Sequence, residues 1–136
     1  MNIDKFKHQH VEILESIAAL RGLVKDGIAA NADGIASQII AMSAVIKLHL
    51  AVEDSVLYPA LQSGNNSKVA HMGKQFQDEM ESIAKAYLNF ARNWNSGASV
   101  ARDPDGFRSD ANTVLKVLHV RMQKENTVFY PAIEAL

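Results

Sequence analysis

Cysteine is missing from the 136 residues, which excludes disulfides, thiolate nucleophiles, zinc–thiolate sites and iron–sulfur clusters. A metal ion in this protein would therefore be held by nitrogen and oxygen ligands. An excess of positive charge is also missing, because 14 Lys and Arg stand against 15 Asp and Glu and give a formal net charge of −1. Nucleic acids and anionic membranes attract basic surfaces, so we expect neither as a partner.

Targeting and membrane-spanning segments are not evident in the sequence. Residues 1–7 are too polar for a signal-peptide core, and we find no run of about 18 apolar residues that would span a bilayer. The composition, with 48% hydrophobic and 21% charged residues, is that of an ordinary globular protein. We therefore expect a single cytoplasmic domain over residues 1–136.

Proline and glycine are scarce, and most of the three prolines and seven glycines lie where helices are expected to begin or end. Segments 3–26, 33–62, 67–96 and 107–134 carry apolar residues at alternating steps of three and four, which is typical of amphipathic helices. The pattern predicts an all-α protein, an antiparallel up-down-up-down four-helix bundle. We expect Ser67 to cap the third helix, and residues 95–106 to form an exposed loop with a turn over 103–106.

Three polar side chains interrupt the apolar stripes of the first two helices: His10, His49 and Glu53. A separation of four residues is a rotation of about 400°, so His49 and Glu53 lie on one helix face. His10 is expected at the same level of the neighbouring antiparallel helix. Burying these groups without partners costs several kcal/mol. They form either a hydrogen-bonded cluster or a metal site, and the alignment of His10 favours the metal.

The chain also contains an internal repeat. Residues 53–61 are similar to residues 125–133, and residues 6–13 can be aligned with residues 76–83. We interpret the chain as two copies of one helical hairpin that share a core. The repeat aligns His10 with Met80, His49 with Arg121 and Glu53 with Glu125. The second copy therefore keeps only the carboxylate.

His119 is an irregular candidate ligand. It precedes Glu125 by six residues, which is about 600° on a regular helix and leaves the two side chains about 120° apart. Pointing both at one ion requires a local distortion such as a π-bulge. A second interpretation stays open, in which Arg121 or Lys124 neutralises Glu125 and no second metal ion is needed.

With these motifs the sequence resembles the hemerythrin-like, or HHE cation-binding, domains. The resemblance covers nearly the whole chain and rests on His10, on His49-x-x-x-Glu53 followed by residues 54–59, and on residues 125–131. It implies an antiparallel four-helix bundle that holds a non-haem di-iron centre through histidines and bridging carboxylates. Members of this family bind or sense oxygen, or handle iron or nitric oxide stress.

The resemblance implies a set of metal ligands in this sequence: His10, His49, Glu53 and Glu125, with His119 as the irregular fifth. Met80 stands where the family usually has a third-helix histidine, and Arg121 stands at the start of the second His-x-x-x-Glu motif. The ligand set for two irons is therefore incomplete, and we expect one or two iron ions. Tyr58 and Tyr130 either hydrogen-bond the ligands or anchor the bundle, and we favour anchoring.

Three functions follow from these features. The first is a non-haem iron protein that binds or senses O2, NO or another diatomic ligand. The alternative is a metal-depleted bundle that acts as a regulatory or protein-interaction module. A third is a metal-based redox enzyme acting on nitrosative or peroxide damage. We rank hydrolytic and transfer enzymes low, because no phosphate loop or activated nucleophile is found in the sequence.

Overall fold

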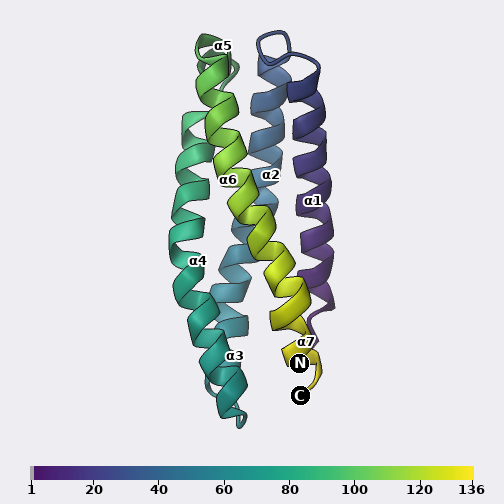
Figure 1. Cartoon of the computed structure of the whole chain (residues 1–136), viewed down its shortest axis with the longest axis vertical. Coiled ribbons are helices and arrows are strands. Elements are labelled where there is room, and N and C mark those ends of the chain that lie inside the picture. The colour runs from purple at the N-terminus through teal and green to yellow at the C-terminus, as the bar shows by residue number, and fades with distance from the viewer. Residues whose placement is uncertain (1) are drawn as a thin grey trace.

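The computed structural model describes residues 2–136 as an antiparallel four-helix bundle, which confirms the predicted fold (Figure 1). Each of the four long helical columns corresponds to one predicted segment. The first column is α1 (Asp4–Lys25), and the second joins α2 (Ala32–Val52), the π-helix η1 (Glu53–Leu57) and α3 (Tyr58–Gln62). The third is α4 (Ser67–Asn93), and the fourth joins α6 (Pro104–Lys124), the π-helix η2 (Glu125–Phe129) and α7 (Tyr130–Glu134). Both termini lie at the same end of the bundle.

The connection between the third and fourth columns differs from the prediction. It contains a short helix, α5 (Gly97–Arg102), and Val100 of this helix is fully buried against the core. The predicted turn over residues 103–106 is instead the first turn of α6, where the Asp103 carboxylate accepts the Gly106 N–H at 3.0 Å. The cap of α4 is also shifted by one residue, from Ser67 to Asn66. All three corrections involve local side-chain hydrogen bonds, from Ser96, Asp103 and Asn66, that the apolar periodicity does not report.

Two π-helical turns occupy equivalent places in the second and fourth columns. The Tyr58 N–H bonds to the Glu53 carbonyl, and the Tyr130 N–H bonds to the Glu125 carbonyl, in each case five residues back. A proline follows each tyrosine and cannot donate a backbone hydrogen bond, which weakens the regular α-helical pattern at this point. Because five residues complete the widened turn, each tyrosine lies on the same helix face as the glutamate before it.

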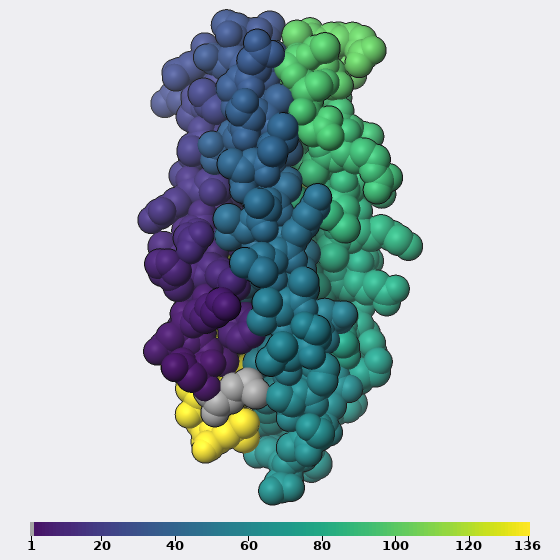
Figure 2. All heavy atoms as spheres, turned by 180° about the vertical axis from the view of Figure 1, so that it is seen from behind, coloured from purple at the N-terminus to yellow at the C-terminus, as the bar shows by residue number. Residues whose placement is uncertain are grey.

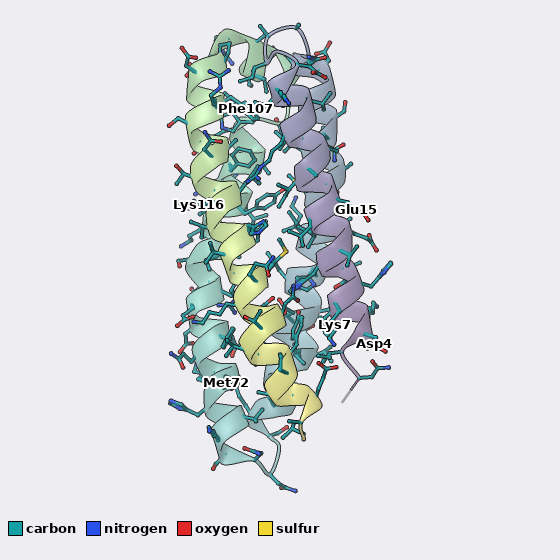
Figure 3. All side chains as sticks on the ribbon, turned by 45° about the vertical axis from the view of Figure 1, so that its right-hand side comes forward. Asp4, Lys7, Glu15, Met72, Phe107 and Lys116 are labelled. Atoms are coloured by element: carbon teal, nitrogen blue, oxygen red, sulfur yellow. The ribbon has the colours of Figure 1, made fainter. Side chains whose placement is uncertain are left out.

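A buried polar layer divides the core into two apolar clusters. The larger cluster fills the half of the bundle near α5, where Phe107 points inward while Glu15 and Lys116 point outward (Figure 3). The smaller cluster lies at the end with the termini and includes Phe6 and Phe129. In the first two columns the polar layer lies between the two clusters in the sequence, and in the fourth column it overlaps the end of the larger cluster, since Arg121 precedes Met122. Its buried members are Gln9, His10, His49, Glu53, Arg121 and Glu125.

The second column contains a strongly apolar segment. Over residues Ala32–Gln62 it is long and apolar enough to cross a membrane by length and composition, with a window of mean hydropathy 1.7. Polar residues such as Gln38 and Lys47 interrupt the segment, so it is not an uninterrupted run of about 18 apolar residues, and core helices of soluble bundles meet the same measure. Buried residues such as Ile35 and Ile39 account for part of this apolar character, and Ile40 and Leu48 are exposed. On the face drawn in Figure 2, this column lies between α1 and α4.

Candidate metal centre

Four buried side chains converge in the polar layer. His10 comes from α1, His49 from α2, Glu53 from η1 and Glu125 from η2, and none is more than 3% exposed. One nitrogen or oxygen atom from each residue lies within 4.8 Å of those of the other three. The structure thus brings together four of the five side chains that the sequence singled out, in an arrangement that could hold a metal ion.

The shortest contacts of this cluster join its two imidazoles to its two carboxylates. His10 Nε2 lies 2.9 Å from Glu125 Oε1, and His49 Nε2 lies 3.1 Å from Glu53 Oε1. The two Nε2 atoms are themselves 3.1 Å apart. His49 Nε2 is also 3.9 Å from Glu125 Oε1. All four side chains therefore point at one small volume between the helices.

The remaining imidazole nitrogens have amide partners that fix both rings. His10 Nδ1 lies 2.8 Å from Asn126 Oδ1, and His49 Nδ1 lies 2.8 Å from Gln9 Oε1. Because an amide oxygen only accepts, each Nδ1 carries a hydrogen, and each neutral ring then presents a lone pair at Nε2. Two lone pairs 3.1 Å apart repel each other. A cation, either a proton or a metal ion, is needed between them.

The titration of the metal-free cluster reflects this need for positive charge. Burial alone would lower the pKa of His49, but hydrogen bonds to Glu125 and Glu53 outweigh burial and raise it to about 9. Burial and the nearby Glu125 charge raise the pKa of Glu53. Burial would also raise the pKa of Glu125, but bonds from His10 and His49 and the Arg121 charge lower it below its usual range. Without metal, a proton on His49 supplies the positive charge at neutral pH.

Glu53 has one oxygen satisfied and one whose only hydrogen bond depends on a proton at His49. The Tyr130 hydroxyl donates to Glu53 Oε2 at 3.1 Å. Glu53 Oε1 is buried, and within the part of the chain that the structure describes it has no hydrogen-bond partner unless His49 Nε2, 3.1 Å away, carries a proton. An unpaired buried carboxylate oxygen is costly, and coordination to a cation would remove the cost. Tyr130 therefore contacts a candidate ligand, contrary to the expectation that it only anchors the bundle.

Arg121 fills the position that the repeat aligns with His49. The side chain is 3% exposed, and its Nε donates to Glu125 Oε2 at 3.2 Å. Its Nη2 donates to the Phe76 carbonyl at 2.7 Å and to the Tyr58 hydroxyl at 3.2 Å. Glu125 thus carries the imidazoles on one oxygen and the guanidinium on the other. This geometry matches the interpretation in which Arg121 neutralises Glu125.

His119 does not join the cluster, so the structure does not support it as a fifth ligand. It is partly exposed, whereas the four clustered residues are buried. For His119 to point at the same ion as Glu125, the helix would need a π-bulge between the two residues. The π-helical turn η2 instead begins at Glu125. The segment from His119 to Glu125 is therefore regular α-helix, and the separation of about 120° persists.

Sequence reasoning missed Gln9 and Asn126. Each directly adjoins a candidate ligand in the sequence, and Gln9 is buried at 6% exposure. In the sequence, each is only a polar residue next to a candidate ligand. Such neighbours are common on amphipathic helices, so they do not identify residues that contact the ligands. Partners of this kind fix the orientation of ligating imidazoles.

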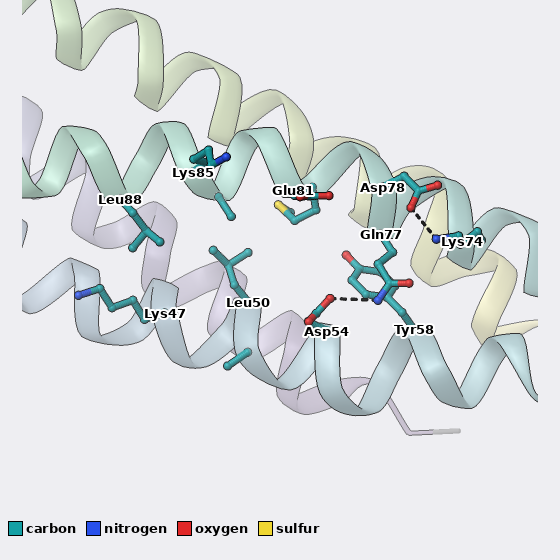
Figure 4. A pocket seen from close by; sticks show the side chains of 13 residues that line it. Lys47, Leu50, Asp54, Tyr58, Lys74, Gln77, Asp78, Glu81, Lys85 and Leu88 are labelled. Carbon is teal, nitrogen blue, oxygen red and sulfur yellow. Dashed lines mark hydrogen bonds and ion pairs between the residues drawn. The ribbon is translucent and has the colours of Figure 1, made fainter.

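A surface groove of about 740 Å³ lies between α2 and α4, close to the polar layer. Figure 4 shows Tyr58 extending into it, near the hydrogen bond between Gln77 and Asp54. None of the four clustered residues lines the groove. Tyr58 also contacts Arg121, so its side chain lies between the groove and the buried network.

The donor set of the cluster fits a divalent transition metal. Two imidazoles and two carboxylates offer nitrogen and oxygen ligands of the kind that iron, manganese and zinc accept. Three features favour an ion at this position. The two imidazole rings are held by Asn126 and Gln9, and the four ligand atoms lie within 4.8 Å of one another. Glu53 Oε1 has no hydrogen-bond partner when His49 Nε2 carries no proton.

Comparison with family models gives a match over nearly the whole chain. The model of the family described as "Hemerythrin HHE cation binding domain" matches residues 1–133. No curated protein and no solved structure matches the chain. The matched residues include all four clustered side chains and nearly all of the four helical columns. The chain therefore belongs to the hemerythrin HHE cation-binding domain family.

Proposed function

We propose that this protein binds non-haem iron at His10, His49, Glu53 and Glu125, and uses it to bind or sense O2, NO or another diatomic ligand. The observation that carries the proposal is the pair of fixed imidazoles, whose Nε2 atoms face each other at 3.1 Å beside two buried carboxylates. A metal ion coordinated by all four side chains would separate the two Nε2 lone pairs and neutralise the buried carboxylates.

The choice of iron rests on the ligand chemistry. Two histidines with carboxylate oxygen are the donor set of non-haem Fe(II) sites that keep coordination positions open. The ion would supply an open position for a small diatomic ligand. The cysteine-free sequence offers no thiolate that would favour a softer metal.

The surrounding residues have separate roles in this proposal. Gln9 and Asn126 hold the imidazoles so that Nε2 faces the ion. The Tyr130 hydroxyl donates to Glu53 and also lies 3.2 Å from His10 Nε2, so it holds a ligand oxygen and remains close to the ion. The apolar clusters on both sides exclude bulk water from the centre.

The experiment is anaerobic reconstitution of chelator-treated protein with Fe(II), followed by elemental analysis and thermal unfolding. We expect iron to remain bound after desalting and to raise the melting temperature, because a ligand that binds only the folded state stabilises it. His49→Ala should lose the iron and this stabilisation together. His119→Ala is the matched control, since it removes a histidine outside the cluster, and should keep both.

Two outcomes would contradict the proposal. Wild-type protein that retains no iron would remove its basis. Iron retained equally by the wild type and His49→Ala would place the ion elsewhere on the chain.

A second candidate function, a metal-free regulatory or interaction module, is favoured by one observation. Met80 and Arg121, which stand where the repeat aligns histidines, are both buried, at 7% and 3% exposure. This function predicts a melting temperature that is indifferent to both chelator and Fe(II). The reconstitution experiment therefore distinguishes the two functions.

A further inference from the structure

We propose that Arg121 is a built-in cation that takes the place of a second metal ion and restricts the centre to one. This inference rests on the proposed function, because it concerns the same centre. It begins from the internal repeat, in which His49 and Glu53 align with Arg121 and Glu125. In each copy the two side chains are four residues apart and in contact, His49 Nε2 with Glu53 Oε1 and Arg121 Nε with Glu125 Oε2.

The contacts of Arg121 show that its guanidinium is held in place. It is fixed by the Phe76 carbonyl at 2.7 Å and the Tyr58 hydroxyl at 3.2 Å, and it lies 4.5 Å from the centre of the Phe76 ring. Glu79 lies 3.5 Å from Nη1, which makes no hydrogen bond within the part of the chain that the structure describes. Moving this side chain away would leave the buried Glu125 Oε2 without its donor, which is costly. Arg121 therefore remains beside Glu125 when the first ion binds.

The balance of buried charge supports a single ion. Glu53 and Glu125 together carry two negative charges, and they are fully buried. One divalent ion matches these charges, and Arg121 adds a further positive charge. Among the buried groups, two divalent ions and Arg121 would carry five positive charges against two negative ones, an excess of three that a low-dielectric interior disfavours. Glu79, which lies 3.5 Å from Arg121 Nη1 and whose side chain is 41% exposed, offsets at most one of them.

The donor atoms also favour a single ion. The repeat aligns Met80 with His10, and a thioether is a poor ligand for iron compared with imidazole. Arg121 has only donors and offers no lone pair to a metal. The side of Glu125 that faces Arg121 therefore lacks the imidazoles that the other side has.

The test is native mass spectrometry of chains reconstituted anaerobically with Fe(II), which counts ions per chain. Wild type should hold one ion. Met80→His/Arg121→His, which restores both aligned imidazoles, should hold two. Arg121→His alone, the simpler variant to fold, should show a second and weaker ion at higher Fe(II) concentration. Lys124→His is the matched control, because it adds an imidazole nearby and leaves Arg121 in place, and it should stay at one.

The results separate this inference from the proposed function. Two ions on wild-type protein, or one ion on both the folded double variant and Arg121→His, would overturn the role of Arg121 and leave iron binding intact. No ion on wild-type protein would overturn the proposed function and this inference with it. Circular dichroism of each variant shows whether it is folded, and Arg121→His decides the question if the double variant is not.

Discussion

Replacing Arg121 with methionine should destabilise the metal-free protein by about 3–5 kcal/mol, because it leaves a buried carboxylate without its cationic partner. Methionine keeps most of the apolar stem and removes the charge. The variant therefore isolates the guanidinium contacts from the packing of the side chain.

The magnitude follows from the groups that lose a partner. Glu125 Oε2 loses its donor at 3.2 Å and is left unpaired, whereas the Phe76 carbonyl loses the guanidinium bond at 2.7 Å but keeps its helical hydrogen bond within α4. Each buried polar group left unpaired costs about 1–3 kcal/mol, and more when the group is charged. Tyr58 loses a donor as well, although its hydroxyl can still donate elsewhere. These losses together are consistent with the range measured for broken buried ion pairs.

The assay is urea unfolding of chelator-treated protein at pH 7, arranged as a double-mutant cycle with Glu125→Gln. Because Arg121 and Glu125 are in direct contact, the double variant should be less destabilised than the sum of the single variants, by at least about 2 kcal/mol. Lys124→Met is the matched control. Lys124 also contacts Glu79 and the Phe76 ring, but its side chain is 45% exposed. Its replacement should cost less than about 0.5 kcal/mol.

Two results would show that Arg121 does not stabilise the buried Glu125 carboxylate. A destabilisation below about 1 kcal/mol for Arg121→Met would mean that the buried pair is solvated or rearranges. Additive effects in the cycle would mean that Arg121 and Glu125 do not interact in solution.

The other predictions concern the imidazoles and their partners. Raising the pH from about 6.5 to 9 should destabilise the metal-free protein by up to about 3 kcal/mol, because the pKa of His49 is raised to about 9 by folding. Urea unfolding across this range checks it, and a flat profile would contradict it. Iron affinity should increase over the same range, since His49 must lose its proton to bind the ion, and a fall in competition titrations would count against this. Gln9→Ala and Asn126→Ala should each weaken iron binding by about 10–100-fold while the bundle stays folded. Unchanged affinity would show that these amides do not orient the rings.

Sequence periodicity was sufficient for the bundle because helix faces follow from residue spacing alone. The same spacing placed His49 and Glu53 on one face, and the level of His10 followed from the antiparallel order. It failed for α5 and for the cap at Asp103, where local side-chain hydrogen bonds decide the structure. Periodicity reports which face a residue occupies, and it does not report which backbone groups need partners.

The candidate centre was only partly predictable for a related reason. Residue spacing predicts the direction of a side chain on its own helix, but it does not predict which side chain of another column it meets. The contacts of Gln9 with His49 and of Tyr130 with Glu53 are of this second kind. The two π-helical turns change the direction of the tyrosines after Glu53 and Glu125. The Glu-x-x-x-x-Tyr-Pro pattern, present twice in the sequence, is a local signal for this geometry.

The most direct test of the account is anomalous X-ray diffraction from crystals of protein loaded with Fe(II), collected at the iron absorption edge. We expect one iron peak per chain, lying among the Nε2 atoms of His10 and His49 and the carboxylates of Glu53 and Glu125. An iron peak only elsewhere on the chain, or no peak from crystals of iron-treated protein, would contradict it.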